Sequence, residues 1–98
     1  MNRTNANNKT DNTNYDPITV TSLGVERVRD TNKGVFFTLE LNGIYIHSCK
    51  VVEGKNGDFI SFPQYKGSNG KWYSYVWAPL SEADSNHIIS LVEAELNS

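Results

Sequence analysis

The sequence predicts an α+β domain: an antiparallel five-stranded sheet in meander order, followed by one C-terminal helix. Three observations lead to this prediction. Segments rich in β-branched and aromatic residues alternate with turn residues between positions 18 and 78. Asn42-Gly43 joins two of these segments as a hairpin turn, and the apolar period becomes helical after Pro79. A chain of 98 residues has room for one such domain.

The first two strands are expected at residues 18–29 and 35–41. The first is rich in Val, Ile and Thr, and a bend is expected at Gly24. Residues 30–34 have the composition of a turn. The second strand alternates apolar and other residues with period two, which predicts one buried face. The expected core residues of that face are Val35, Phe37, Leu39 and Leu41.

Three further strands are expected after the Asn42-Gly43 turn. The third covers residues 44–52, because a type I′ turn returns the chain directly along the second strand. The fourth covers residues 59–62 and ends at Pro63, since proline cannot donate a backbone hydrogen bond. The fifth covers residues 72–78, after a hairpin tip at Gly67–Gly70, and ends at Pro79.

The C-terminal segment has the pattern of one amphipathic helix. Ser81 is an N-cap residue, and Asp84 stands where a capping box has an acidic residue. The apolar positions expected on one helix face are Ile88, Leu91, Val92 and Leu96. One short helix covers only one face of a sheet, so the other face must be polar or be used for binding.

Residues 1–16 differ in composition from the rest of the chain. They are rich in Asn and Thr, with almost no apolar side chain to bury. Such a segment cannot offset the entropy of ordering, so we expect a disordered tail and a folded domain at residues 17–98.

Composition excludes several classes of function. The net charge is −2, which excludes a globally cationic protein but allows a local basic patch. One cysteine excludes an intrachain disulfide and a Cys-rich zinc site. No apolar run is long enough to span a membrane and no signal sequence is visible, so a cytoplasmic protein without a membrane partner is expected.

Catalysis finds no support in the sequence. There is no nucleophile-elbow motif, and the expected strand alternation places His47 and Cys49 on one face, which supplies two metal ligands and not four. We therefore expect no enzymatic activity, no catalytic residue, no metal, no cofactor and no small-molecule substrate.

Residues 50–77 concentrate aromatic rings and lysines. Four lysines stand against two acidic residues in this stretch, together with seven aromatic residues. Lysines follow phosphates and aromatic rings stack on unpaired bases, a combination typical of single-strand binders. Alternation along the fifth strand predicts that Trp72 and Val76 lie in the core. It predicts that Tyr73, Tyr75 and Trp77 face outward, as a subunit interface, a nucleic-acid platform or ordinary packing.

Residues 46–63, IHSCKVVEGKNGDFISFP, resemble the signature of the stage V sporulation protein G (SpoVG) family. The family pattern is an apolar strand running into V-[IV]-[DE]-G-x-N-G-x-F-[IV]-x-x-P, and residues 51–63 follow it. Asn69-Gly70-Lys71-Trp72 is similar to a second turn of the family, and the resemblance extends over residues 18–96. It implies a small sheet-plus-helix domain that forms a homodimer, binds DNA or RNA and acts as a regulator in processes such as sporulation and septation.

The resemblance also implies which residues bind. In the family, a basic pair follows the motif proline; here the corresponding residues are Tyr65 and Lys66, of which only the second is basic. The fifth strand is also more aromatic than the family pattern. These departures favour stacking on unpaired bases, as in a single-stranded DNA binder of a phage or mobile element. An alternative is a protein-binding adaptor that uses the same aromatic face.

The candidate residues divide by chemistry. The expected phosphate contacts are Lys55, Lys66 and Lys71, with Arg27 and Arg29 as outer candidates. The expected stacking residues are Tyr65, Tyr73 and Tyr75, and Trp77 is expected in or beside the dimer interface. Lysines on one face would favour nucleic acid, whereas lysines interspersed with Glu40, Glu53 and Asp58 would favour the adaptor.

Overall fold

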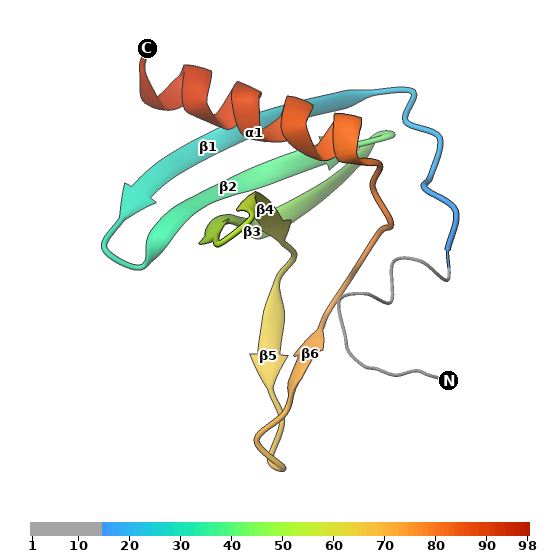
Figure 1. Cartoon of the computed structure of the whole chain (residues 1–98), viewed down its shortest axis with the longest axis vertical. Coiled ribbons are helices and arrows are strands. Elements are labelled where there is room, and N and C mark those ends of the chain that lie inside the picture. Colours follow the sequence, from blue (N-terminus) through green and yellow to red (C-terminus); the bar gives the residue numbers. More distant parts are fainter. Residues whose placement is uncertain (1–14) are drawn as a thin grey trace.

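The computed structural model describes residues 15–98, so residues 1–14 of the tail expected at residues 1–16 lie outside the described part of the chain. Tyr15, which was expected in the tail, packs against Trp77. A four-stranded antiparallel sheet is covered on one face by a single helix, and a two-stranded ribbon projects away from both (Figure 1). The elements are β1 (Leu23–Thr31), β2 (Gly34–Leu41), β3 (Ile44–Gly54), β4 (Gly57–Ser61), β5 (Gln64–Lys66), β6 (Trp72–Ser74) and α1 (Glu82–Leu96). The main sheet has the order β1-β2-β3-β4, so each strand pairs with its neighbour in sequence.

The α+β class and the meander of the first four strands are confirmed, and the single five-stranded sheet is wrong. The last strand does not join the main sheet; β6 pairs only with β5, in a separate two-stranded sheet. Pro63 follows directly after the buried Phe62, where the chain leaves β4 and turns into the ribbon. The expected strand at residues 72–78 is therefore cut to Trp72–Ser74.

The first strand begins later than expected, and a side chain explains the difference. The Asn42 Oδ1 atom accepts hydrogen bonds from the Thr21 and Ser22 backbone N–H groups at 2.7 and 3.3 Å. The Asn42 Nδ2 atom donates to the Thr19 carbonyl oxygen at 2.9 Å. Because these bonds satisfy the backbone before Leu23, that segment does not pair with β2 as a regular strand.

Two β-bulges face the middle of β2. Pairing of β1 with β2 shifts between Glu26 and Arg29, and pairing of β3 with β2 shifts between Phe37 and Leu39. Each bulge contains a non-glycine residue with positive φ, Arg27 at 55° and Ser48 at 66°. The bend expected at Gly24 thus lies further along the strand, and Gly24 pairs regularly with Glu40.

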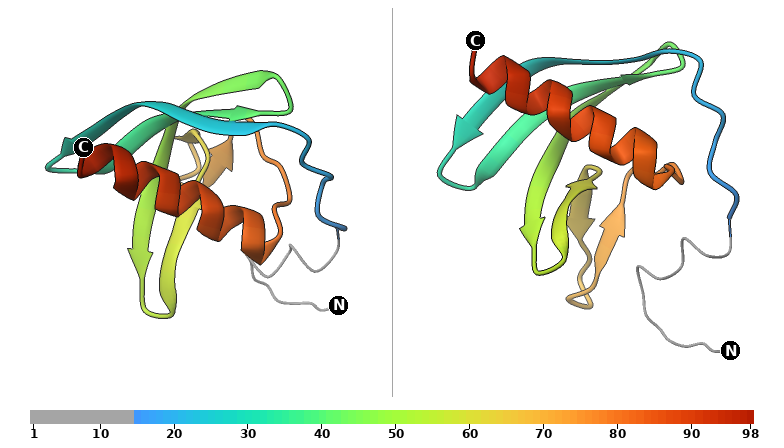
Figure 2. Two further views of the ribbon diagram at one scale, coloured as in Figure 1. Left: turned by 90° about the horizontal axis from the view of Figure 1, so that it is seen from above. Right: turned by 45° about the horizontal axis from the view of Figure 1, so that its top comes forward.

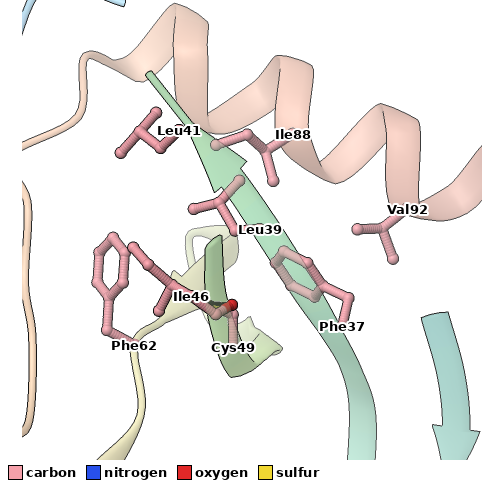
Figure 3. Packing of buried hydrophobic residues seen from close by; sticks show 8 residues of the cluster. All are labelled: Phe37, Leu39, Leu41, Ile46, Cys49, Phe62, Ile88 and Val92. Carbon is pink, nitrogen blue, oxygen red and sulfur yellow. Dashed lines mark hydrogen bonds between the residues drawn. The ribbon is translucent and has the colours of Figure 1, made fainter. Parts of the chain in front are cut away.

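The core lies between α1 and the helix-facing side of the sheet (Figure 3). Its buried members include Phe37, Leu39, Leu41, Ile46, Cys49, Phe62, Ile88 and Val92. Three of the four expected β2 positions are buried, while Val35 packs against the cluster from its edge. On α1, Ile88 and Val92 are buried as expected, Ile89 is buried as well, and Leu96 remains exposed.

The helix begins as the sequence predicts. The Asp84 backbone N–H donates to the Ser81 side-chain oxygen at 3.1 Å, which is the N-cap hydrogen bond. Glu82 and Asp84 in the first turn interact favourably with the positive end of the helix dipole. The cap fixes where the helix starts, and further along the helix Ile88 and Val92 pack in one core cluster with Phe37 and Leu39.

Candidate functional site

The β5–β6 ribbon carries a cluster of three tyrosines. Tyr65 and Tyr73 are opposite each other in the ribbon, with ring centroids 5.6 Å apart in a stacked arrangement. Tyr75 lies one step further, where its backbone N–H donates to the Pro63 carbonyl oxygen at 2.9 Å. Its ring is 4.7 Å from that of Tyr65. These three residues are called the tyrosine cluster below.

The tyrosine cluster is exposed, yet contacts within the ribbon position it. The Asn69 Nδ2 atom donates to the Tyr73 hydroxyl at 2.9 Å, and the Asn69 Oδ1 atom accepts from the Lys71 backbone N–H at 3.0 Å. The Tyr73 ring also lies against Gly67, where an added Cβ would come within 2.8 Å of the ring. Asn69 and Gly67 thus orient Tyr73, even though 41% of that residue is exposed. Preorganised rings lose less entropy when a flat ligand stacks on them.

The ribbon carries two lysines, on opposite sides. Alternation places Lys71 on the tyrosine side of the ribbon and Lys66, which pairs with Trp72, on the other side. Both lysines are exposed, and no acidic residue occurs from position 59 to position 81. The ribbon is therefore locally positive within an acidic chain, and it is aromatic on both sides.

Trp72 is a correction to the sequence analysis. It was expected in the core together with Val76, but 63% of Trp72 and 39% of Val76 are exposed. The alternation of the strand predicted two faces correctly. Because the strand pairs in a projecting ribbon and not in the main sheet, no helix covers either face (Figure 1).

Trp77 does not belong to the tyrosine cluster. It lies in the connection between β6 and α1, and its ring meets that of Tyr15 edge to face, with centroids 5.4 Å apart. Nearby, the Ile18 backbone N–H donates to the Pro79 carbonyl oxygen at 2.9 Å. The outward stripe expected over Tyr73, Tyr75 and Trp77 is thus divided between the ribbon and this connection.

Lys55 lies apart from the ribbon lysines. It occupies the turn of the β3–β4 hairpin, which projects separately from the ribbon (Figure 2). Glu53 and Asp58 pair across the two strands beside this turn. Two carboxylates therefore lie close to Lys55 at the hairpin, whereas the ribbon has no acidic residue.

Arg27 and Arg29 also lie outside the ribbon, on β1 at its bulge. The Arg27 Nε atom is 3.9 Å from a carboxylate oxygen of Glu26, an ion pair with both side chains at least half exposed. Of the predicted site residues, the structure thus brings together the three tyrosines and two lysines. It leaves Lys55, the two arginines and Trp77 elsewhere.

His47 and Cys49 do not share a face. The bulge places His47 and Ser48 together opposite Thr38 and breaks the alternation, so that His47 is exposed while Cys49 is fully buried. Burial raises the pKa of the Cys49 thiol to about 11, and the thiol stays protonated at neutral pH. Within residues 15–98, no three His, Cys, Asp or Glu side chains come together as a metal-binding group. In the same part of the chain, no helix is long and apolar enough to cross a membrane.

Comparisons of the chain with protein-family models, curated proteins and solved structures find no match. The resemblance to the SpoVG family therefore depends on the residues quoted above, in particular positions 51–63. In the structure this motif forms the end of β3, the hairpin turn and β4, with the motif proline at the entry to the ribbon.

Proposed function

We propose that this protein is a small, non-enzymatic nucleic-acid-binding regulator of SpoVG type that acts in the cytoplasm and stacks unpaired bases on the tyrosine cluster. One observation carries the proposal: three exposed tyrosines are held together on a projecting ribbon that carries two lysines and no acidic residue. Aromatic rings accept any base by its flat face, and amines beside them bind the phosphate backbone. The resemblance of residues 51–63 to the SpoVG signature supports the same class of ligand.

The mode of binding follows from this arrangement. Paired bases are stacked on each other and hide their faces, so a platform of rings favours single-stranded DNA or RNA. Tyr65 and Tyr75 are the most suitable stacking residues, because Tyr73 is already engaged by Asn69 and packed on Gly67. With two lysines on each ribbon, binding should be modest in affinity and sensitive to salt.

The test is a titration of fluorescein-labelled 20-nucleotide dT, the matching duplex and an RNA of the same length, followed by anisotropy. Stacking contributes ~1–3 kcal/mol per base, so the double variant Tyr65→Ala/Tyr75→Ala should bind dT at least tenfold more weakly. Tyr45→Ala is the matched control, because Tyr45 is also exposed but lies on β3. Wild-type affinity in a folded double variant would overturn the proposal.

We also propose that the protein forms a homodimer with Trp77 in or beside the interface. Tyr15, Val76 and Trp77 expose apolar surface around the connection between β6 and α1. Tyr and Trp are enriched at protein–protein interfaces, and a dimer would present two ribbons to one strand of nucleic acid. Sedimentation equilibrium should give a dimer at micromolar concentration and a monomer for Trp77→Lys; a wild-type monomer would refute this part.

A protein-binding adaptor is the alternative function. In that case the exposed aromatic residues would bind a polypeptide. The mixture of positive and negative charges at the β3–β4 hairpin fits a protein ligand better than the purely positive ribbon does. The adaptor becomes the leading hypothesis if none of the three nucleic acids binds.

A further inference from the structure

The side of the sheet opposite α1 carries a second feature, created by the two bulges. Arg27 and Val28 of β1 lie opposite Phe37, and His47 and Ser48 of β3 lie opposite Thr38. Both neighbours of β2 therefore bulge at adjacent positions of that strand. Non-glycine residues with positive φ are uncommon, and outliers of this kind cluster at functional sites.

A cleft of about 470 Å³ lies at the two bulges. Its lining residues are Arg27, Arg29, Phe37, Thr38, His47 and Ser48. Two arginines thus line one cleft, and among the described residues none that lines it is acidic. Glu26 contacts Arg27 from outside the lining, but 75% of the Arg27 side chain is exposed, so the pair is screened by solvent and leaves Arg27 available to bind another anion.

The floor of the cleft contains a buried polar pair. Thr38 is only 3% exposed, and its Oγ1 atom is 3.0 Å from the Nδ1 atom of His47. If Thr38 donates this bond, the neutral imidazole carries its hydrogen on Nε2. If His47 donates it, the hydroxyl hydrogen of Thr38 is not used in this bond. In either tautomer the pair retains a hydrogen-bond donor besides the guanidinium groups.

We propose that this cleft is an anion site that binds a phosphate group of the nucleic-acid backbone. Arginine matches phosphate in geometry, because its planar fork donates two parallel hydrogen bonds to two oxygens. The proposal rests on the proposed function for the source of the phosphate. The site itself depends only on the cleft, its two arginines and the Thr38–His47 pair.

This site explains the placement of Arg27 and Arg29 away from the ribbon. A single strand of nucleic acid whose bases stack on the tyrosine cluster also needs phosphate contacts. The ribbon supplies only two cations for this purpose, Lys66 and Lys71. The cleft adds two cations per protomer at a second position. Each phosphate contact on a single strand adds ~0.7 to the slope of log affinity against log salt concentration, so the cleft should be visible in that slope.

The decisive variant is Arg27→Gln/Arg29→Gln, measured with labelled 20-nucleotide dT at several salt concentrations. Because the cleft binds one phosphate group, we expect the salt slope to flatten by about 0.7, with the melting temperature unchanged because both residues are exposed. Lys33→Gln is the control, since it removes a positive charge from an exposed turn outside the lining of the cleft. Arg29→Lys keeps the charge but loses the planar fork, and it should weaken dT binding by less than the glutamine pair.

A second measurement identifies the source of the phosphate. Inorganic phosphate is titrated into ¹⁵N-labelled protein while the Nε–H signals of the arginines are followed by NMR. Shifts at Arg27 and Arg29 that are lost in Thr38→Val would support the anion site independently of nucleic acid. Two results together would overturn the anion site: the wild-type salt slope in a folded Arg27→Gln/Arg29→Gln variant, and no phosphate-induced shift of the arginine signals in the wild-type protein.

The two proposals fail separately. If the arginine variant keeps the wild-type slope while Tyr65→Ala/Tyr75→Ala loses binding, the proposed function stands and the cleft does not bind the nucleic-acid backbone. If no nucleic acid binds but inorganic phosphate shifts the arginine signals, the anion site stands and its assignment to the nucleic-acid backbone is overturned along with the proposed function.

Discussion

Reversing the two ribbon lysines should separate binding from folding. In Lys66→Glu/Lys71→Glu, both substitutions fall on exposed positions of a ribbon that lies outside the core. Exposed substitutions usually change the free energy of unfolding by less than about 0.5 kcal/mol, so the melting temperature should barely move. Binding should change strongly, because each protomer loses two phosphate contacts and gains two repulsive charges.

The size of the effect follows from counterion release. Two lost contacts flatten the slope of log affinity against log salt by about 1.4 for a single strand and about 1.8 for a duplex. Between ~50 and ~200 mM salt, a slope change of 1.4 corresponds to a factor of roughly seven. The advantage of the wild type over the variant should therefore shrink about sevenfold across this range, as measured by anisotropy with labelled dT.

The control for this experiment is Lys33→Glu, compared with the single variants Lys66→Glu and Lys71→Glu. It changes the net charge by the same amount as each of these, but at the β1–β2 turn. If the control flattens the slope as much as the ribbon variant does, total charge and not the ribbon governs binding. If neither variant alters affinity or slope, the ribbon is not the nucleic-acid site.

Three further predictions concern the parts that hold the site and the fold. Gly67→Ala should weaken dT binding without lowering the melting temperature, because the new Cβ displaces the Tyr73 ring. Ser68→Ala, at the same tip, is the control and should leave both dT binding and the melting temperature unchanged. Asn42→Ala should lower the free energy of unfolding by about 1–3 kcal/mol in a urea titration, because four hydrogen bonds of the side chain to residues 19–22 are lost and alanine disfavours the φ of 53°. Asn42→Gly, which tolerates that φ, should lose less. The pKa of Cys49 is about 11 when folded against 9.0 for a free thiol, so this thiol stabilises the fold fully below pH 9 and its contribution falls as the pH rises toward 11. Wild-type stability should therefore fall more steeply than that of Cys49→Ala above pH 9, and equal slopes would show that the thiol ionises as easily in the folded chain.

Local signals in the sequence predicted most of the main sheet and the helix. The Asn42-Gly43 turn sets the register of β2 and β3, with Leu41 opposite Ile44, as a two-residue hairpin requires. The cap at Ser81 and the apolar spacing of Ile88 and Val92 likewise describe interactions within a few residues of each other. Such signals are readable because both partners of each interaction are close in sequence.

The bulges could not be predicted, because they depend on contacts between strands. Arg27 and Ser48 adopt positive φ although neither residue type favours it, so no local preference marks the positions. The consequence for function was large. A regular strand would have put His47 and Cys49 on one face, whereas the bulge buries Cys49 and leaves His47 beside Thr38 at the cleft.

The aromatic alternation of the last strand was read correctly, and its place in the fold was not. Period-two alternation states that Tyr73 and Trp72 face opposite ways, but it does not state which sheet the strand joins. The sequence predicts Trp72 in the core because Val76, on the same face, matches the apolar positions of the other strands. The chain offered one relevant signal: a proline on each side of residues 64–78, which limits how far pairing can continue.

Separation of the ribbon from the core has a consequence for how this protein can change. Buried residues of the described chain lie on β2, β3 and α1 or at Phe62, and none lies within residues 64–77. A substitution in the ribbon therefore removes no core contact, while it directly alters the rings and charges offered to a ligand. The ribbon can thus accept an unusually aromatic sequence at little cost in stability. Under the proposed function, the departures of residues 65–77 from the SpoVG pattern would bear on ligand preference and not on the core, to which residues 18–62, the segment 78–80 and α1 contribute.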